Sequence, residues 1–123
     1  MLKSADIVPY ILIACGGFTG AALRFLIDEQ VTTLAGTLIV NVTGCFLLGM
    51  FMYESIYIGR FGRNTRLFFG VGFIGAFTTF SALAVQSFEV LPVVGVLNMS
   101  ANIVLGLIGV LAGRHVISYQ RGI

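Results

Sequence analysis

Charged residues are scarce in this sequence, and their scarcity excludes most kinds of soluble protein. Only 10% of the 123 residues are Asp, Glu, Lys or Arg, whereas 58% are hydrophobic. Soluble domains carry about 25% charged residues, and so few charges could not cover the surface of a water-soluble domain of this length. The net charge of +2 is also too small to indicate a nucleic-acid partner. The composition therefore predicts an integral membrane protein.

Cysteine and histidine are rarer still, with two cysteines and one histidine in the chain. Cys15 and Cys45 lie in apolar runs without a Cys-x-x-Cys spacing. This placement favours small residues of a membrane core over a disulfide or a metal pair. The sequence also shows no nucleophile with a base and no set of metal ligands, so we do not expect an enzyme.

Four apolar segments are long enough to cross a bilayer, which takes about 20 mostly apolar residues in a helix. They cover residues 7–27, 33–53, 67–88 and 91–113, and short connections join them. The first could be mistaken for a signal peptide, but it is too long, and Arg24 closes it where a cleavage site would stand. We expect one four-helix transmembrane domain over residues 1–123, in the inner (plasma) membrane of the cell.

Carboxylates are missing from the middle of these segments, and Glu54 and Glu89 stand only at segment ends. A small proton-coupled multidrug exporter needs a mid-membrane carboxylate to carry its proton. The sequence therefore argues strongly against such an exporter, which is the alternative from another functional class.

Lysine and arginine are distributed unequally between the two membrane faces that four spans create. One face has only Arg24, and the other has the remaining six: Lys3, Arg60, Arg63, Arg66, Arg114 and Arg121. An excess of Lys and Arg marks the cytoplasmic side, so both termini are expected there.

Glycine is abundant, with 16 residues in the chain and several in each span. In lipid, where no hydrophobic force drives helices together, small residues allow the close backbone approach that packing needs. The glycines therefore predict tight helix contacts without indicating a function. Four helices leave little room for an internal pathway, so a dimer is the simplest working assembly.

The polar residues inside the spans are neutral. Asn41 lies in the second span, and Asn98 and Asn102 lie on one face of the fourth. In the third span, GFIGAFTTFS at residues 72–81 is poor material for an unbroken helix. Each feature alone could be a hydrogen-bonded packing contact. Together, amide and hydroxyl donors with aromatic ring edges suit an anion, and without a fixed cation they would hold it weakly enough to conduct it.

These residues resemble a known family, the small fluoride channels called Fluc or CrcB. The similarity covers nearly the whole chain and is carried by GFTGAALR at 17–24, GTLIVNVTG at 36–44 and the third-span motif at 72–81. It implies an all-α integral membrane fold of four helices, with the third broken at its centre, working as an antiparallel homodimer with two pores. Such a channel lets cytoplasmic fluoride leave passively and so confers fluoride resistance.

The resemblance also implies roles for individual residues. Asn41 would donate to fluoride, and Phe80 would turn its ring edge toward the ion. Thr79 and Ser81 would supply nearby hydroxyls, and Arg24 would lie near an aqueous vestibule.

The resemblance further implies a bound cation, and at some positions this sequence departs from the family pattern. The backbone carbonyls of Gly75 and Thr78 would hold a structural sodium ion at the dimer interface. Leu83 stands where the family has a second phenylalanine, and Asn98 and Asn102 align with its Tyr-x-x-x-Ser on the fourth span.

The partner is left open between two readings. Fluoride, the lipid bilayer and a second, inverted copy of the chain are expected, but the six-to-one Lys and Arg bias favours insertion in one orientation only. A subunit that needs a homologous partner of opposite bias is therefore the alternative to a homodimer.

Overall fold

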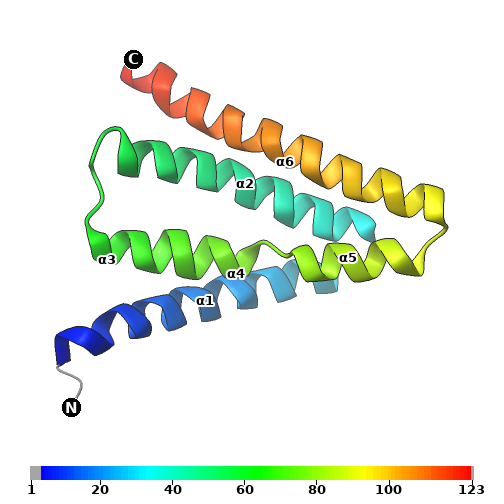
Figure 1. Cartoon of the computed structure of the whole chain (residues 1–123), viewed down its shortest axis with the longest axis horizontal. Helices are drawn as coiled ribbons and strands as arrows, with labels where there is room; N and C mark the ends of the chain where they lie inside the picture. The colour runs from blue at the N-terminus through cyan, green and yellow to red at the C-terminus, as the bar shows by residue number, and fades with distance from the viewer. Residues whose placement is uncertain (1–3, 123) are drawn as a thin grey trace.

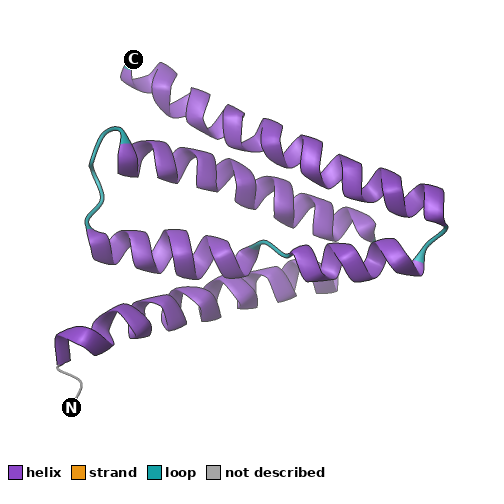
Figure 2. Cartoon of the chain, viewed as in Figure 1, coloured by secondary structure: helices purple, strands orange, loops and turns teal. Residues whose placement is uncertain are grey.

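The computed structural model describes residues 4–122 as four long helical rods packed side by side (Figure 1). Helix α1 covers Ser4–Gln30, α2 covers Leu34–Ile56, and α6 covers Pro92–Arg121. The third rod spans Arg63–Glu89 in several pieces, and within the described part of the chain Figure 2 shows helices and loops without a strand. All four rods are long and apolar enough to cross a membrane, which confirms the predicted all-α, four-span fold.

The helices extend past the ends of the predicted spans, most clearly at the C-terminus. The fourth span was expected to end at residue 113, whereas α6 continues to Arg121 and ends at Gly122. Gly122 has a φ of 66°, the left-handed conformation that glycine adopts readily and that commonly ends a helix. Hydropathy marks where apolar residues stop, and a helix can continue beyond that point into water. Lys3 lies outside the described residues.

Two pairs of helices form the bundle: α2 packs on α6, and α1 packs on the first half of the third rod. Glycine makes both contacts possible. A Cβ added to Gly113 of α6 would overlap the carbonyl oxygen of Phe46 on α2, and one added to Gly20 of α1 would overlap that of Phe73. The backbones are therefore in direct contact, as the glycine content predicted.

The third rod consists of four helical pieces with one interruption. The pieces are α3 (Arg63–Thr65), the π-helical segment η1 (Arg66–Ile74), α4 (Gly75–Phe77) and α5 (Phe80–Glu89). Between α4 and α5 the chain runs through an extended loop, which lies in the middle of the rod in Figure 2. The expected break at the centre of the third span is confirmed.

Two threonines form this break. Thr78 (φ −77°, ψ 154°) and Thr79 (φ −146°, ψ 120°) are both extended rather than helical. The Thr78 hydroxyl donates to the carbonyl of Ile74 at 3.1 Å, while the Thr79 hydroxyl oxygen accepts from the backbone N–H of Ala82 at 3.2 Å. The Thr79 oxygen thus satisfies a backbone N–H at the start of α5, which is the usual role of a threonine at a helix N-cap.

Large apolar side chains cover the outside of the bundle. Phe18 is 77% exposed and Phe88 is 86% exposed. Contiguous exposed apolar surface of this kind is typical of contact with lipid or a partner chain.

Candidate functional site

Asn41 of α2 lies beside the break and holds it. Its side-chain Oδ1 accepts the backbone N–H of Thr79 at 2.8 Å, and its Nδ2 donates to the Thr79 carbonyl at 3.0 Å. Both backbone groups of one loop residue are therefore paired with one side chain. This arrangement satisfies the polar groups that an interrupted helix exposes at membrane depth.

A chain of amides continues from Asn41 into α6. The second N–H of Asn41 Nδ2 donates to Oδ1 of Asn102 at 2.9 Å. Asn102 Nδ2 donates in turn to the carbonyl and the Oδ1 of Asn98, at 3.0 and 3.3 Å. Asn98 Nδ2 donates to the hydroxyl of Ser87 on α5 at 2.9 Å. The stripe of asparagines predicted from sequence is thus one buried hydrogen-bonded network.

Ser87 is the member of this network that sequence reasoning missed. It is 7% exposed and lies one helical turn after the buried Leu83 on α5. That spacing places the two residues on one face of α5. A serine that continues a buried apolar face could have identified Ser87 from the sequence as a buried polar contact.

A groove of about 310 Å³ lies next to the break, and we call it the break groove. Five residues predicted for the fluoride path line it: Asn41, Thr79, Phe80, Leu83 and Asn102. None of the described residues that line the groove is charged. Asn98 is not among the residues that line the groove, but it accepts a hydrogen bond from Asn102, which does line it.

The two α5 residues on this path differ in exposure. Phe80 is 68% exposed, so its ring stands away from the rest of the chain, while Leu83 is 3% exposed and packs within it. The ring of Phe80 is thus available to an ion or a partner chain, and Leu83 contributes mainly to the packing of the groove wall.

The predicted sodium ligands also line the break groove, and their carbonyls have lost their usual helical donors. In an unbroken helix the N–H of Thr79 would bond to the Gly75 carbonyl, and that of Ala82 to the Thr78 carbonyl. Instead Thr79 N–H donates to Asn41 and Ala82 N–H donates to the Thr79 hydroxyl. Carbonyl oxygens without their donors are hard ligands that fit a small cation.

A second groove, of about 390 Å³, opens between α1 and α5, and we call it the Arg24 groove. It is lined by Arg24, Ser81 and Thr79, together with Asp28 and Gln86. Thr79 therefore lies on the walls of both grooves. The Thr79 and Ser81 hydroxyls are 3.2 Å apart, so the two predicted hydroxyl donors are brought together.

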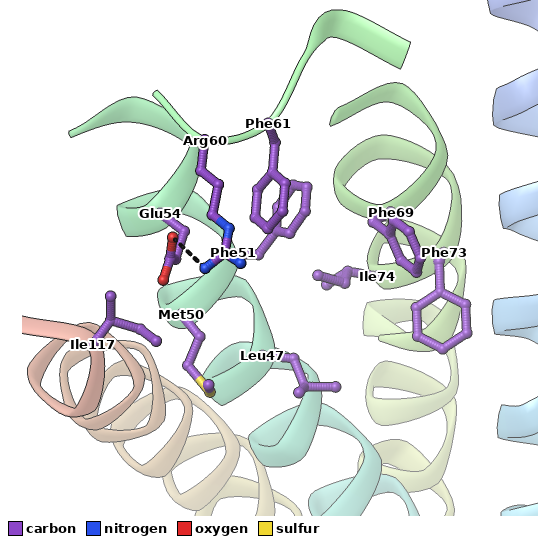
Figure 3. Close-up of a pocket in the computed structure, with 10 residues that line it drawn as sticks. All are labelled: Leu47, Met50, Phe51, Glu54, Arg60, Phe61, Phe69, Phe73, Ile74 and Ile117. Carbon is purple, nitrogen blue, oxygen red and sulfur yellow. Dashed lines mark ion pairs between the residues drawn. The ribbon is translucent and has the colours of Figure 1, made fainter. Parts of the chain in front are cut away.

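An aromatic groove of about 400 Å³ lies toward the other membrane face and shares Ile74 with the break groove (Figure 3). Phenylalanine rings from α2, η1 and the loop between them form its walls, and Figure 3 shows Glu54 and Arg60 at its rim. Glu54 is 8% exposed and accepts from Arg121 Nη2 at 2.8 and 3.1 Å, with Arg60 4.0 Å away. Sequence reasoning placed Glu54 only at a span end and missed this ion pair.

Comparison with known proteins shows a consistent similarity. Residues 11–114 match the model of the family described as CrcB-like protein, Camphor Resistance (CrcB). The "Fluoride-specific ion channel FluC 1" of Methanospirillum hungatei is 51% identical over 106 residues, covering 86% of this chain and 76% of the relative. The "FluC 2" proteins of Methanosarcina mazei and Methanosarcina acetivorans are 55% and 51% identical. They cover 87% and 94% of this chain, and 85% and 91% of their own lengths.

Proposed function

The chain belongs to the CrcB-like family, and from that membership we propose that it is a fluoride-specific ion channel, a multi-pass protein of the plasma membrane. Fluoride would leave the cytoplasm passively through it, and no chemical step would be catalysed. The observation that carries the proposal is a groove at membrane depth, lined by amides, hydroxyls and an exposed phenylalanine and by no described charged residue.

Fluoride selectivity follows from the groups that this groove presents. Fluoride is a small anion with a tightly held hydration shell, so several strong donors must replace its water. Asn41 brings an amide and Thr79 a hydroxyl to this groove, and the Phe80 edge adds partial positive charge. Without a fixed cation the ion is held weakly and leaves again quickly.

The path would connect two aqueous regions through Thr79. Arg24 lies on the Arg24 groove with Ser81, where its guanidinium would attract an anion locally, while Asp28 on the same groove balances its charge. Thr79 lines both this groove and the break groove, so its hydroxyl, with that of Ser81, would pass the ion between them.

An antiparallel homodimer would complete the pathway. The break groove is open along one side of the chain, and the exposed Phe80 ring extends from it. A second, inverted copy would close the groove and bring its own Phe80 to the neighbouring path, which gives two pores per dimer.

Sodium would be a structural cofactor of this dimer. Gly75 and Thr78 line the break groove and their carbonyls lack their helical donors, so two such pairs from two copies could surround one cation. Bound there, the ion would supply the positive charge that these oxygens need.

A heteromeric channel is the second candidate, and the distribution of basic residues favours it. Of the seven Lys and Arg residues only Arg24 lies on the outer side, and such a bias predicts one orientation. The relatives carry numbers, FluC 1 or FluC 2, which is compatible with paired subunits. Leu83 fits this reading too, because an unlike partner could supply the missing aromatic ring.

The function is tested by measuring fluoride release from liposomes that contain only this purified chain. A fluoride electrode should record efflux far above that of empty liposomes, with chloride release at background. Liposomes that release neither anion, although the protein is folded and inserted, would contradict a self-sufficient channel.

The partner is tested by a cysteine placed at Ser118, near the end of α6, after Cys15 and Cys45 have been replaced. A membrane-impermeant thiol reagent should label about half of the molecules from each side if the chain inserts both ways. Labelling from the cytoplasmic side alone, together with absent fluoride efflux, would support an unlike partner instead.

A further inference from the structure

The side chain of Asn41 has two N–H groups, and both are in use. One donates to the Thr79 carbonyl, where it completes a closed pair with the bond from Thr79 N–H to Asn41 Oδ1. The other donates to Oδ1 of Asn102 at 2.9 Å and belongs to no such pair. The bond to Asn102 is therefore the one that a ligand could replace while the break stays paired.

Asn102 is held so that its oxygen, and not its nitrogen, faces Asn41. Its Nδ2 donates to the backbone carbonyl of Asn98 at 3.0 Å, and the side chain is 5% exposed. If the amide were reversed, the nitrogens of Asn41 and Asn102 would face each other, and the Asn98 carbonyl would face an oxygen. Two buried mismatches of this kind are costly, so one orientation is strongly preferred.

From Asn41 onward the donors in this network point the same way. Asn41 donates to Asn102, Asn102 donates to Asn98, and Asn98 donates to Ser87. The network therefore presents an acceptor to Asn41 at the wall of the break groove, since both Asn41 and Asn102 line that groove.

We propose that Asn102 is a positioning residue whose side-chain oxygen occupies the Asn41 N–H that fluoride would otherwise take. This inference rests on the proposed function. It makes the Asn102 oxygen a competitor of fluoride for one N–H of Asn41. Fluoride binds at Asn41 by displacing the Asn102 oxygen, and the oxygen reclaims the N–H when the ion leaves. A passing anion then exchanges one hydrogen bond for another, which keeps its binding weak and its release fast.

The matching experiment measures how fluoride flux depends on fluoride concentration for the unaltered chain and for Asn102→Leu, which keeps the shape but removes the oxygen. Flux through the unaltered chain establishes the proposed function separately. In Asn102→Leu, the fluoride concentration at half-maximal flux should fall about five-fold, the size of one net hydrogen bond. Ser100→Leu introduces the same side chain at an exposed position of α6 outside the network and should stay within about two-fold of the unaltered chain.

A folded Asn102→Leu channel with an unchanged or higher half-maximal concentration would overturn the proposal, because a residue that merely packs would not tighten fluoride binding. In Asn102→Ala, which leaves space for water, the half-maximal fluoride concentration should fall as it does in the leucine variant. The alanine variant therefore tests the proposal if the leucine variant does not fold.

A second measurement uses the unaltered protein and two assigned signals. Nitrogen-15 spectra of asparagine-labelled protein should show the side-chain amide of Asn41 shifting on titration with sodium fluoride but not with sodium chloride, and the Asn102 amide should shift with it. An Asn41 signal that moves while Asn102 remains fixed, or an Asn41 signal indifferent to fluoride, contradicts displacement.

Discussion

Helix α2 makes two contacts of opposite character. Along α6 its backbone touches Gly113 directly, with no polar side chain between them. At the break, a single amide side chain, that of Asn41, joins α2 to Thr79 through two directed hydrogen bonds. The first contact permits one arrangement because atoms cannot overlap. The second is continued by a hydrogen bond from Asn41 to Asn102, whose acceptor an anion can replace. The comparison separates what holds the bundle from what can respond to an ion.

The largest expected effect comes from filling the glycine contact. In Gly113→Val the new side chain would overlap the carbonyl of Phe46, and the helices would have to separate. We expect a loss of at least about 3 kcal/mol and of the folded protein, seen as aggregation on size-exclusion chromatography in detergent. Gly62→Ala, where an added Cβ meets nothing within 4 Å, should behave like the unaltered chain. A monodisperse Gly113→Val protein would show that the contact is not tight.

The second effect concerns the amide contact and should separate flux from folding. Asn41→Asp places a negative charge beside the path, and at about 4 Å with an effective dielectric of 20 it repels an anion by about 4 kcal/mol. Asp also loses the N–H bonds to Thr79 and Asn102, so some loss of stability is expected. Efflux is therefore measured on the folded fraction from size-exclusion chromatography, where it should fall to background. Asn64→Asp, an exposed residue of α3, adds the same charge elsewhere and serves as the control. Unchanged efflux in Asn41→Asp would remove Asn41 from the path.

Sodium removal should have an intermediate effect, centred on the carbonyls of Gly75 and Thr78. Without a cation these oxygens would lack a partner, so replacing sodium by a large organic cation should weaken the dimer and lower efflux by about ten-fold. Cross-linking yield and electrode traces, compared at equal ionic strength, measure both. If neither responds, the carbonyls do not depend on sodium.

The smallest effect should come from the ion pair at the opposite face. Glu54→Gln weakens the bonds to Arg121, a residue whose side chain is 37% exposed, so we expect about 1 kcal/mol of destabilisation. The thermal midpoint in detergent should drop by a few degrees, and fluoride efflux per folded protein should not change. A clear loss of efflux would bring the aromatic groove into the ion path.

Hydropathy was enough to predict the four spans, and the Gly-Thr-Thr pattern was enough to predict where the third one breaks. The partners of Asn41 were beyond reach, because Thr79 is 38 residues away and Asn102 is 61, and no local pattern specifies such pairings. The same holds for Glu54 and Arg121, which are 67 residues apart. Leu83 could be placed on the path from its alignment with the second phenylalanine of the family pattern, but its near-complete burial depends on how α5 packs against α6.

The pairing of Asn41 with Thr79 has a consequence for motion. An interrupted rod usually bends at its interruption, but here one side chain occupies both backbone groups at that point, much as a neighbouring strand would. The backbone hydrogen of Thr79 should therefore exchange with heavy water about as slowly as those inside α4 and α5. The third rod would then move as one rigid body, and ions would pass the break without a hinge motion of the helices on either side.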